Sequence, residues 1–205
     1  MKIALPRGRL LGDAIEIMSQ AIPGLVAPDS RELIGSNGEH QVLLAKPVDV
    51  PTYVEEGADI GITGRDVIRE KPADLFIPLS LPFGKCRISV ARLSGDSSSP
   101  EEMKGYRIAT EYPNITRSYF YSLGVEVEVI VVDGSTELAP RAGIADAIVD
   151  VVQTGGTLDA NNLEEAAVIM ESSALLAVNR IAQKTKFDQI NDLIYSIREV
   201  IRDGS

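Results

Sequence analysis

The stretch at residues 150–158 carries side chains suited to binding a phosphorylated sugar. It reads Asp-Val-Val-Gln-Thr-Gly-Gly-Thr-Leu and follows the apolar residues 147–149, which predict a buried strand. Glycines let the backbone approach an anion closely, threonine hydroxyls add uncharged donors, and Asp150 can accept hydrogen bonds from sugar hydroxyls. Alone, the stretch fits a tight strand-to-helix connection as well as a binding loop. The candidate binders are Asp150, Thr154, Gly155, Gly156 and Thr157.

A second candidate is Pro-Arg-Gly-Arg-Leu at residues 6–10, directly after a predicted strand and at the start of a predicted helix. Two arginines around a glycine add fixed positive charge to the exposed N–H groups of a helix start, which suits a polyphosphate. A solvated surface pair explains these residues equally well. The residues concerned are Arg7, Gly8 and Arg9.

Further cations stand beside Lys-Pro-Val-Asp-Val-Pro at residues 46–51 and Gly-Arg-Asp at residues 64–66. Two prolines around Asp49 predict a rigid turn before a helix that Asp49 caps. Lys46 and Arg65 are candidate anion binders, although a plain helix start accounts for the pattern as readily. Cys86 has no histidine or acid beside it in the sequence, so we expect a small core residue rather than a nucleophile.

Composition narrows the possible functions. The 205 residues include 30 acidic and 20 basic side chains, and the net charge of −10 disfavours nucleic acid and anionic membranes as partners. With one histidine, His40, and one cysteine, the chain cannot form an internal disulfide or a zinc site built on a cysteine pair. The first residues do not resemble a signal peptide and the apolar runs are too short to span a membrane. A cytoplasmic protein is expected.

The elements that must position these residues alternate between short apolar strands and helical patterns, which predicts an α/β fold with largely parallel sheets. Expected strands are 2–5, 41–45, 59–63, 86–91, 107–110, 125–132 and 147–152. Expected helices are 10–21, 51–56, 116–123, 138–142 and a C-terminal amphipathic helix over 187–201.

A weak internal repeat suggests two lobes of similar topology. Gly-Ala-Asp-Ile-Gly-Ile-Thr-Gly at residues 57–64 is similar to Gly-Ile-Ala-Asp-Ala-Ile-Val at 143–149, which continues to Thr-Gly at 154–155. In each, an aspartate leads into a short buried strand that ends near Thr-Gly. Open α/β sheets bind ligands at such strand ends, so we expect a shared cleft, with chance similarity as the alternative.

Together these segments resemble the ATP phosphoribosyltransferase family in its short form. The most specific match covers residues 137–158, from Glu137 through the Ile-Ala-Asp-Ala-Ile-Val-Asp run to Thr-Gly-Gly-Thr. Shorter matches lie at residues 4–10, 49–54, 59–66, 83–87 and 109–114, and the resemblance spans residues 2–180.

The resemblance implies a two-lobed, periplasmic-binding-protein-like (type II) α/β fold with a cleft between the lobes. Lobe I would comprise residues 1–86 and 178–205, and lobe II residues 87–177 with the phosphoribosyl pyrophosphate loop. Because short-form members lack an added regulatory domain, a histidyl-tRNA-synthetase-like regulatory subunit is the implied partner, in a hetero-oligomer.

The implied reaction condenses ATP with 5-phosphoribosyl 1-pyrophosphate, with Mg²⁺ held mainly by substrate. Phosphoribosyl pyrophosphate would bind at Asp150 and residues 154–157. ATP or pyrophosphate would bind at Arg7, Gly8, Arg9, Lys46 and Arg65. No residue is assigned as acid or base. Arg9 and Glu137 are the candidates for a catalytic role, with a structural role in the loop equally open for Glu137.

Two positions depart from the family pattern, because Lys46 replaces the usual arginine and Arg7 replaces a common lysine. Both keep the charge while changing the geometry of anion contacts. Two other functions stay open. One is a salvage-type phosphoribosyltransferase, disfavoured because Val149 rather than a second acid precedes Asp150. The other is a non-catalytic two-lobed anion-binding protein, usually an exported class.

Overall fold

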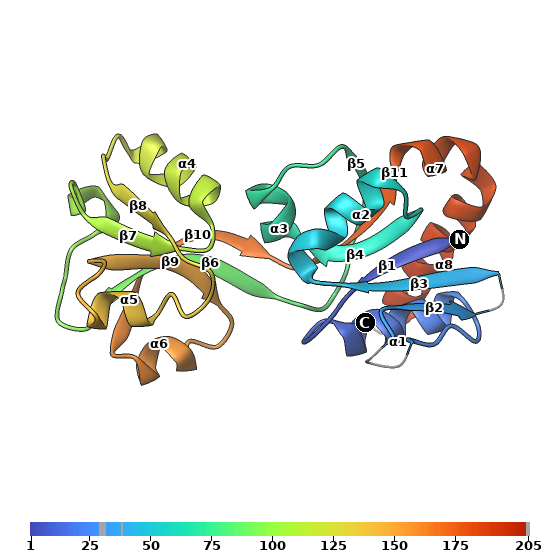
Figure 1. Cartoon of the computed structure of the whole chain (residues 1–205), viewed down its shortest axis with the longest axis horizontal. Coiled ribbons are helices and arrows are strands. Elements are labelled where there is room, and N and C mark those ends of the chain that lie inside the picture. The colour runs from blue at the N-terminus through green and yellow to red at the C-terminus, as the bar shows by residue number, and fades with distance from the viewer. Residues whose placement is uncertain (29–31, 38, 204–205) are drawn as a thin grey trace. The chain divides into compact units, whose positions relative to one another are not determined.

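The computed structural model describes residues 1–28, 32–37 and 39–203, which form two compact units (Figure 1). Unit 1 comprises Met1–Gly84 with Ser173–Ser205, and unit 2 is the continuous segment Lys85–Ser172. The boundary expected at 177/178 lies later than the observed one. The reason is that strand β11, Ala174–Asn179, pairs along its length with strands of unit 1.

Unit 1 contains a six-stranded mixed sheet in the order β2-β3-β1-β4-β11-β5. Strands β3, β1 and β4 run parallel, while β2, β11 and β5 are antiparallel to their neighbours. The strands are β1 (Lys2–Pro6), β2 (Ile34–Asn37), β3 (His40–Ala45), β4 (Ile60–Gly64), β5 (Leu75–Ser80) and β11.

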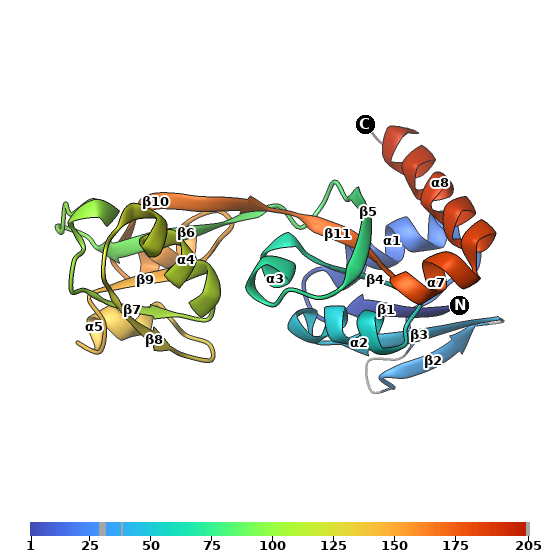
Figure 2. The ribbon, with the colours of Figure 1, turned by 90° about the horizontal axis from the view of Figure 1, so that it is seen from above.

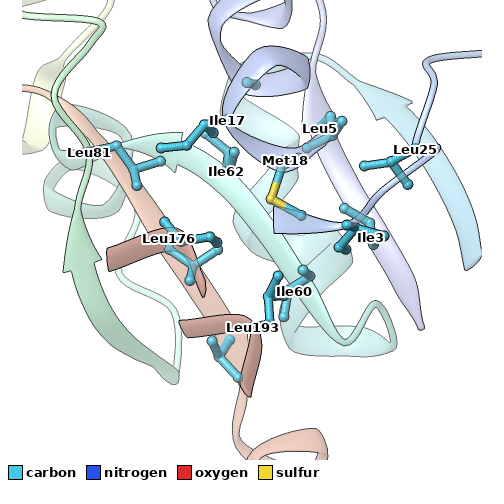
Figure 3. Packing of buried hydrophobic residues seen from close by; sticks show 14 of the residues in the cluster. Ile3, Leu5, Ile17, Met18, Leu25, Ile60, Ile62, Leu81, Leu176 and Leu193 are labelled. Atoms are coloured by element: carbon cyan, nitrogen blue, oxygen red, sulfur yellow. The ribbon is translucent and has the colours of Figure 1, made fainter. Parts of the chain in front are cut away.

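Helices cover both faces of this sheet, as Figure 2 shows for α1, α8 and α2. Ile3 and Leu5 point toward α1 and α8, while Ala4 points toward α2, as the period-two alternation of a strand requires. Figure 3 shows the larger cluster, in which Met18 of α1 and Leu193 of α8 meet the strands. The helices are α1 (Leu11–Ala21), α2 (Val50–Glu56), α3 (Arg65–Glu70), α7 (Arg180–Thr185) and α8 (Phe187–Asp203), with a 3-10 turn η1 (Pro47–Asp49).

Unit 2 contains a five-stranded sheet in the order β10-β6-β9-β7-β8. Strands β9, β7 and β8 are parallel, and β6 and β10 are antiparallel. One apolar cluster lies under α4 and another under α5 and α6. The elements are β6 (Cys86–Leu93), η2 (Pro100–Glu102), β7 (Arg107–Thr110), α4 (Pro113–Leu123), β8 (Glu128–Val131), α5 (Leu138–Arg141), β9 (Ala147–Val152), α6 (Gly156–Ala160) and β10 (Leu163–Ser172).

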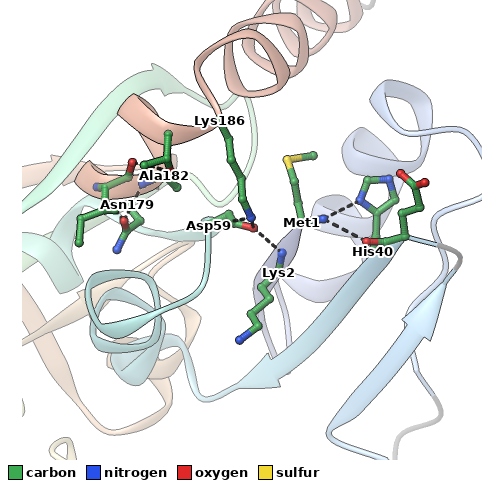
Figure 4. Close-up of polar contacts among 10 residues, drawn as sticks. Met1, Lys2, His40, Asp59, Asn179, Ala182 and Lys186 are labelled. Carbon is green, nitrogen blue, oxygen red and sulfur yellow. Dashed lines mark hydrogen bonds and ion pairs between the residues drawn. The ribbon is translucent and has the colours of Figure 1, made fainter.

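The predicted internal repeat corresponds to equivalent strands of the two sheets. Asp59 precedes β4 and accepts a hydrogen bond of 2.7 Å from the backbone N–H of Lys2, where β1 begins. Asp146 precedes β9 and accepts one of 2.9 Å from the backbone N–H of Arg107, where β7 begins. Each aspartate also pairs with a cation: Lys186 at 2.8 Å from Asp59 (Figure 4), and the Arg107 side chain at 2.8 Å from Asp146. In each unit, an aspartate bonded to a backbone N–H and paired with a cation therefore fixes the start of the parallel strands.

The expected strands and helices are all present, although residues 125–127 precede β8 rather than belong to it. The C-terminal helix buries Ile190, Leu193, Ile194 and Ile197, as its periodicity predicts. Within the described residues, no helix is both long and apolar enough to cross a membrane.

Candidate functional site

In unit 2, a buried strand leads directly to the predicted binding loop. The first residues of β9 are fully buried, Asp150 is half-buried, and Val152 is buried again at the strand end. The chain then turns through Gly155, whose φ of 90° lies in the left-handed region that favours glycine. Leu158 anchors the short helix α6 in the core, while Thr154 and Thr157 are exposed. Hydroxyl and backbone donors are thus presented to solvent on a firmly held loop.

Asp150 is the most perturbed acid among the described residues. Burial, helped by the negative charges of Glu111 and Glu137, raises its pKa to about 6. A hydrogen bond of 2.6 Å from the backbone N–H of Val151 opposes that shift. Glu111 follows β7 and Glu137 precedes α5, so three acids face the carboxyl edge of this sheet. Near pH 7 this carboxylate is ionised and open to hydroxyl donors.

Arg87 of β6 holds the first residue of the loop. Its Nη1 donates to the carbonyl oxygen of Gln153 at 3.3 Å, and its Nε pairs with Glu165 at 2.7 Å. In the sequence this arginine stood out only as part of the family match at residues 83–87. The contact of Arg87 with the loop could not be predicted from that match, because it depends on the β6–β9 pairing, in which Arg87 lies opposite Val152.

In unit 1, four predicted anion binders gather at one edge of the sheet. Residues 7–9 follow β1 directly, Lys46 follows β3, and Arg65 begins α3 after β4. These three strands are parallel neighbours, so their carboxyl ends share one edge. The backbone N–H of Arg7 donates to Ala45 at 2.7 Å, which ties two of these strand ends together. The side chains of Arg7, Arg9, Lys46 and Arg65 are exposed there.

Local backbone geometry and contacts bear on four of the candidate residues. Gly8 has a φ of 84°, which explains a glycine between the two arginines. Arg65 donates to the Ser80 hydroxyl at 3.0 Å. The prediction that Asp49 caps α2 is wrong: Asp49 sits at the N-cap with helical dihedral angles, and its side chain makes no capping bond in the described chain. Cys86 is buried, as expected of a core residue.

His40 lies away from this arrangement. His40 begins β3, at the opposite end of that strand from Lys46. In the part of the chain that the structure describes, no group of three or more His, Cys, Asp or Glu side chains could hold a metal ion. The candidate residues offer hydroxyl and backbone hydrogen-bond donors in unit 2 and cationic side chains in unit 1, both of which suit the binding of anions.

Comparison with known proteins identifies the family. Residues 46–199 match the HisG family model, ATP phosphoribosyltransferase. A protein from Thermococcus gammatolerans named ATP phosphoribosyltransferase is 56% identical over 205 residues, covering 100% of both chains. A solved structure of the ATP phosphoribosyl transferase (HisG:HisZ) complex from Thermotoga maritima is 33% identical, with a TM-score of 0.88 over 99% of both chains.

A more distant neighbour bears on the fold alone. The periplasmic aliphatic sulphonate binding protein SsuA from Escherichia coli is 11% identical, with a TM-score of 0.66, covering 97% of this chain and 71% of that one. The predicted periplasmic-binding-protein-like fold class is confirmed. Sequence match and fold agree, and the chain belongs to the ATP phosphoribosyltransferase family.

Proposed function

We propose that this chain condenses ATP with 5-phosphoribosyl 1-pyrophosphate to give N1-(5-phosphoribosyl)-ATP and pyrophosphate, the first step of histidine biosynthesis. The observation that carries the residue assignment is an ionisable carboxylate near the end of buried β9, followed by an exposed turn rich in hydroxyls and glycines. A phosphorylated ribose has the matching groups, because its hydroxyls donate to a carboxylate and its phosphate accepts from N–H and O–H groups.

In this proposal, unit 2 binds the phosphoribosyl group. Thr154, Gly155, Gly156 and Thr157 bind the 5-phosphate, and Asp150 accepts hydrogen bonds from the ribose hydroxyls. Uncharged donors suit this unit because Glu111 and Glu137 already bring negative charge to the same edge.

Unit 1 binds polyphosphate through Arg7, Arg9, Lys46 and Arg65, with Gly8 shaping the turn. Adenine N1 attacks the anomeric carbon, the bond from that carbon to pyrophosphate breaks, and the centre inverts through an oxocarbenium-like state. The protein contributes by orienting two polyanions and by stabilising the departing negative charge. No residue is assigned as acid or base. Arg9 is the cation proposed nearest to catalysis, and Glu137 is proposed to shape the loop.

Mg²⁺ is the proposed cofactor, carried to the protein by the substrates. Mg²⁺ is usually bound through substrate phosphates and water with few protein ligands, and the described residues do not supply a ligand cluster of their own. When bound to pyrophosphate, the ion offsets the charge of the leaving group. No protein residue is assigned to it.

We further propose a histidyl-tRNA-synthetase-like regulatory subunit as the partner and the cytoplasm as the location. The solved relative whose name includes HisG and HisZ supports the partner, since it matches this chain along nearly its whole length. The location is supported by the proposed substrates, because ATP and phosphoribosyl pyrophosphate are available in the cytoplasm.

The test is formation of phosphoribosyl-ATP, followed by absorbance, with the chain alone and with the partner. Asp150→Asn and Thr154→Ala should each lower kcat/KM for phosphoribosyl pyrophosphate by about 10- to 100-fold, as expected for lost hydrogen bonds to charged groups. Asp159→Asn, which alters an exposed acid on α6, is the matched control and should keep its activity.

Three outcomes would contradict the proposal. Product formed equally well by Asp150→Asn and wild type would remove Asp150 from the site. Binding of phosphoribosyl pyrophosphate without turnover, with and without the partner, would instead indicate an anion-binding protein. Turnover with a free purine or pyrimidine base in place of ATP would indicate a salvage-type enzyme.

A further inference from the structure

The hydroxyl of Ser89 is a buried polar group without a hydrogen-bond partner among the described residues. Ser89 is fully buried in β6, between β9 and β10. A buried hydroxyl that makes no hydrogen bond loses those it made to water, and native proteins rarely leave one in that state. The function described above does not use this group.

Strand pairing places Ser89 directly opposite Asp150. The two residues are partners in the antiparallel β6–β9 register, while Val168 is the partner of Ser89 on the other side. Opposite residues of antiparallel strands point to the same face, with Cβ atoms about 5 Å apart. Of the two partners, only Asp150 has a side chain that accepts a hydrogen bond.

The face they share carries α5 and α6. Ile88 and Val90, which flank Ser89 in β6, belong to the cluster under α4. Ser89 therefore points the other way, toward the cluster that contains Ile148 and Val152 of β9. Asp150 lies between those two residues in β9 and points to the same side, two residues before the end of the strand that leads into the binding loop.

The charged groups near Asp150 favour a neutral hydrogen-bond donor as the partner of its carboxylate. Glu111 at the end of β7 and Glu137 before α5 repel its charge. Arg87 of β6 is engaged by Glu165 of β10 and by the Gln153 carbonyl. Asp159 of α6 is exposed. Oδ1 of Asp150 accepts from the Val151 N–H, so Oδ2 is the atom suited to a hydroxyl donor.

We propose that Ser89 is a positioning residue for Asp150, whose carboxylate accepts a hydrogen bond from the Ser89 hydroxyl when phosphoribosyl pyrophosphate binds. The bond holds the carboxylate ionised and directed at the ribose hydroxyls. A change of side-chain rotamer is enough to form it, because the strand register already fixes the Cβ separation. The inference rests on the proposed ribose-binding role of Asp150.

The test is the pH profile of kcat at saturating substrate, which reports the groups of the substrate-bound enzyme in which this bond forms, measured on Ser89→Ala and Ser89→Cys in the assembly that turns over. A donor to the charged form lowers the pKa of a carboxyl, so its removal should move the acid limb upward by about 0.5 to 1 pH unit. Ser89→Ala should lose about 3- to 10-fold at pH values a unit or more below the midpoint of the wild-type acid limb, and less than about 2-fold near pH 9. The weaker donor of Ser89→Cys should give a smaller shift in the same direction.

Ser98→Ala is the matched control. It removes a unit 2 hydroxyl that lies 3.0 Å from the Tyr106 hydroxyl. Tyr106 directly precedes β7, so this contact lies at the opposite edge of the sheet from the carboxyl ends of the parallel strands. Its acid limb should coincide with that of wild type. Thermal unfolding of every variant separates a loss of folding from a change in titration.

The results that would overturn the inference differ from those that would overturn the proposed function. Acid limbs of Ser89→Ala and Ser89→Cys that coincide with wild type would reduce Ser89 to a packing residue. Asp150→Asn separates the two cases: if it keeps the affinity for phosphoribosyl pyrophosphate and the acid limb, the site assignment itself fails. If it loses both while the Ser89 variants stay unshifted, only the inference fails.

Discussion

At the scale of single residues, Asp150 shows a conflict between stability and binding. Its half-buried carboxyl stands near two other acids and has a pKa of about 6 in the folded protein. The usual pKa of an aspartate is about 3.9. The folded state therefore holds this proton more tightly than the unfolded state does. The resulting contribution to stability is complete below about pH 4 and is lost as pH rises through about 6.

Asp150→Asn should therefore be more stable than wild type at pH 8, with a Tm higher by a few degrees, because a desolvated charge is removed. At pH 5 the gain in unfolding free energy should be about half as large, since the wild-type carboxyl is then mostly protonated in the folded state. Thermal unfolding at both pH values measures the effect, with Asp159→Asn as the control. An asparagine variant less stable than wild type at pH 8 would show that the charge stabilises the fold.

At the scale of elements, the binding loop depends on one backbone conformation. Gly155 has a φ of 90°, and an added Cβ would meet open space, so strain rather than collision decides the effect of a substitution. Gly124, which ends α4, has a φ of 70° and equally open surroundings. The two glycines thus offer matched strain inside and outside the proposed site.

Gly155→Ala and Gly124→Ala should each cost about 1 kcal/mol of unfolding free energy. Only Gly155→Ala should raise KM for phosphoribosyl pyrophosphate, because only that turn presents the proposed phosphate donors. Chemical denaturation and steady-state kinetics on both variants check this. Equal kinetics would mean that the Gly155 turn tolerates the shift or does not bind substrate.

The aspartates that precede β4 and β9 are a second element-scale feature. Arg107 donates to Asp146 from its backbone and its side chain, and these bonds lower the pKa of the aspartate. A lowered folded pKa contributes stability above the unfolded value, about 3.9, that is lost as pH falls through the folded value.

Asp146→Asn should therefore lower the Tm at pH 7, and the difference should shrink below about pH 4. Asp133→Asn, at an exposed acid after β8, is the comparison variant and should leave the Tm unchanged. A pH-independent difference for Asp146→Asn would assign the effect to packing instead of charge.

At the scale of the whole molecule, the two units differ in how the chain builds them. Unit 2 is one continuous segment with its own sheet and an apolar cluster on each face. Unit 1 needs two separate segments, because its main cluster includes Leu176 of β11 and Leu193 of α8.

Residues 85–172 expressed alone should therefore fold cooperatively, whereas residues 1–84 alone should not. Circular dichroism during heating distinguishes the two fragments. Phosphoribosyl pyrophosphate should raise the Tm of the first fragment if unit 2 binds the phosphoribosyl group. A non-cooperative melt of 85–172 would show that unit 2 depends on the rest of the chain.

The sequence predicted the elements whose burial pattern is local and regular. Strand β9 and helix α8 show an apolar run and a clear helical period. Strand β10 was missed because its residues, Leu-Glu-Glu-Ala-Ala-Val-Ile-Met-Glu-Ser, mix charged and apolar types along an irregular pairing with β6.

The residues of the candidate site likewise differ in whether a local sequence pattern could reveal them. Asp150 and the threonines follow one another in the chain, so a local pattern revealed them. Ser89 lies opposite Asp150 on β6, and Glu111 follows β7, so only the strand order and register bring them near Asp150. Long-range pairing carries no local signal in a single sequence.

The position of β11 has a consequence for synthesis on the ribosome. β11 lies between β4 and β5 in the sheet, yet it is made after all of unit 2. When residue 172 has been added, the sequence of unit 2 is complete. Unit 1 then still lacks β11, which joins β5 to the rest of the sheet, and α8, which packs on the Ile60 and Ile62 side of that sheet. The nascent chain therefore passes through a stage with uncovered apolar strands in unit 1, and this stage is where chaperone binding or aggregation should concentrate.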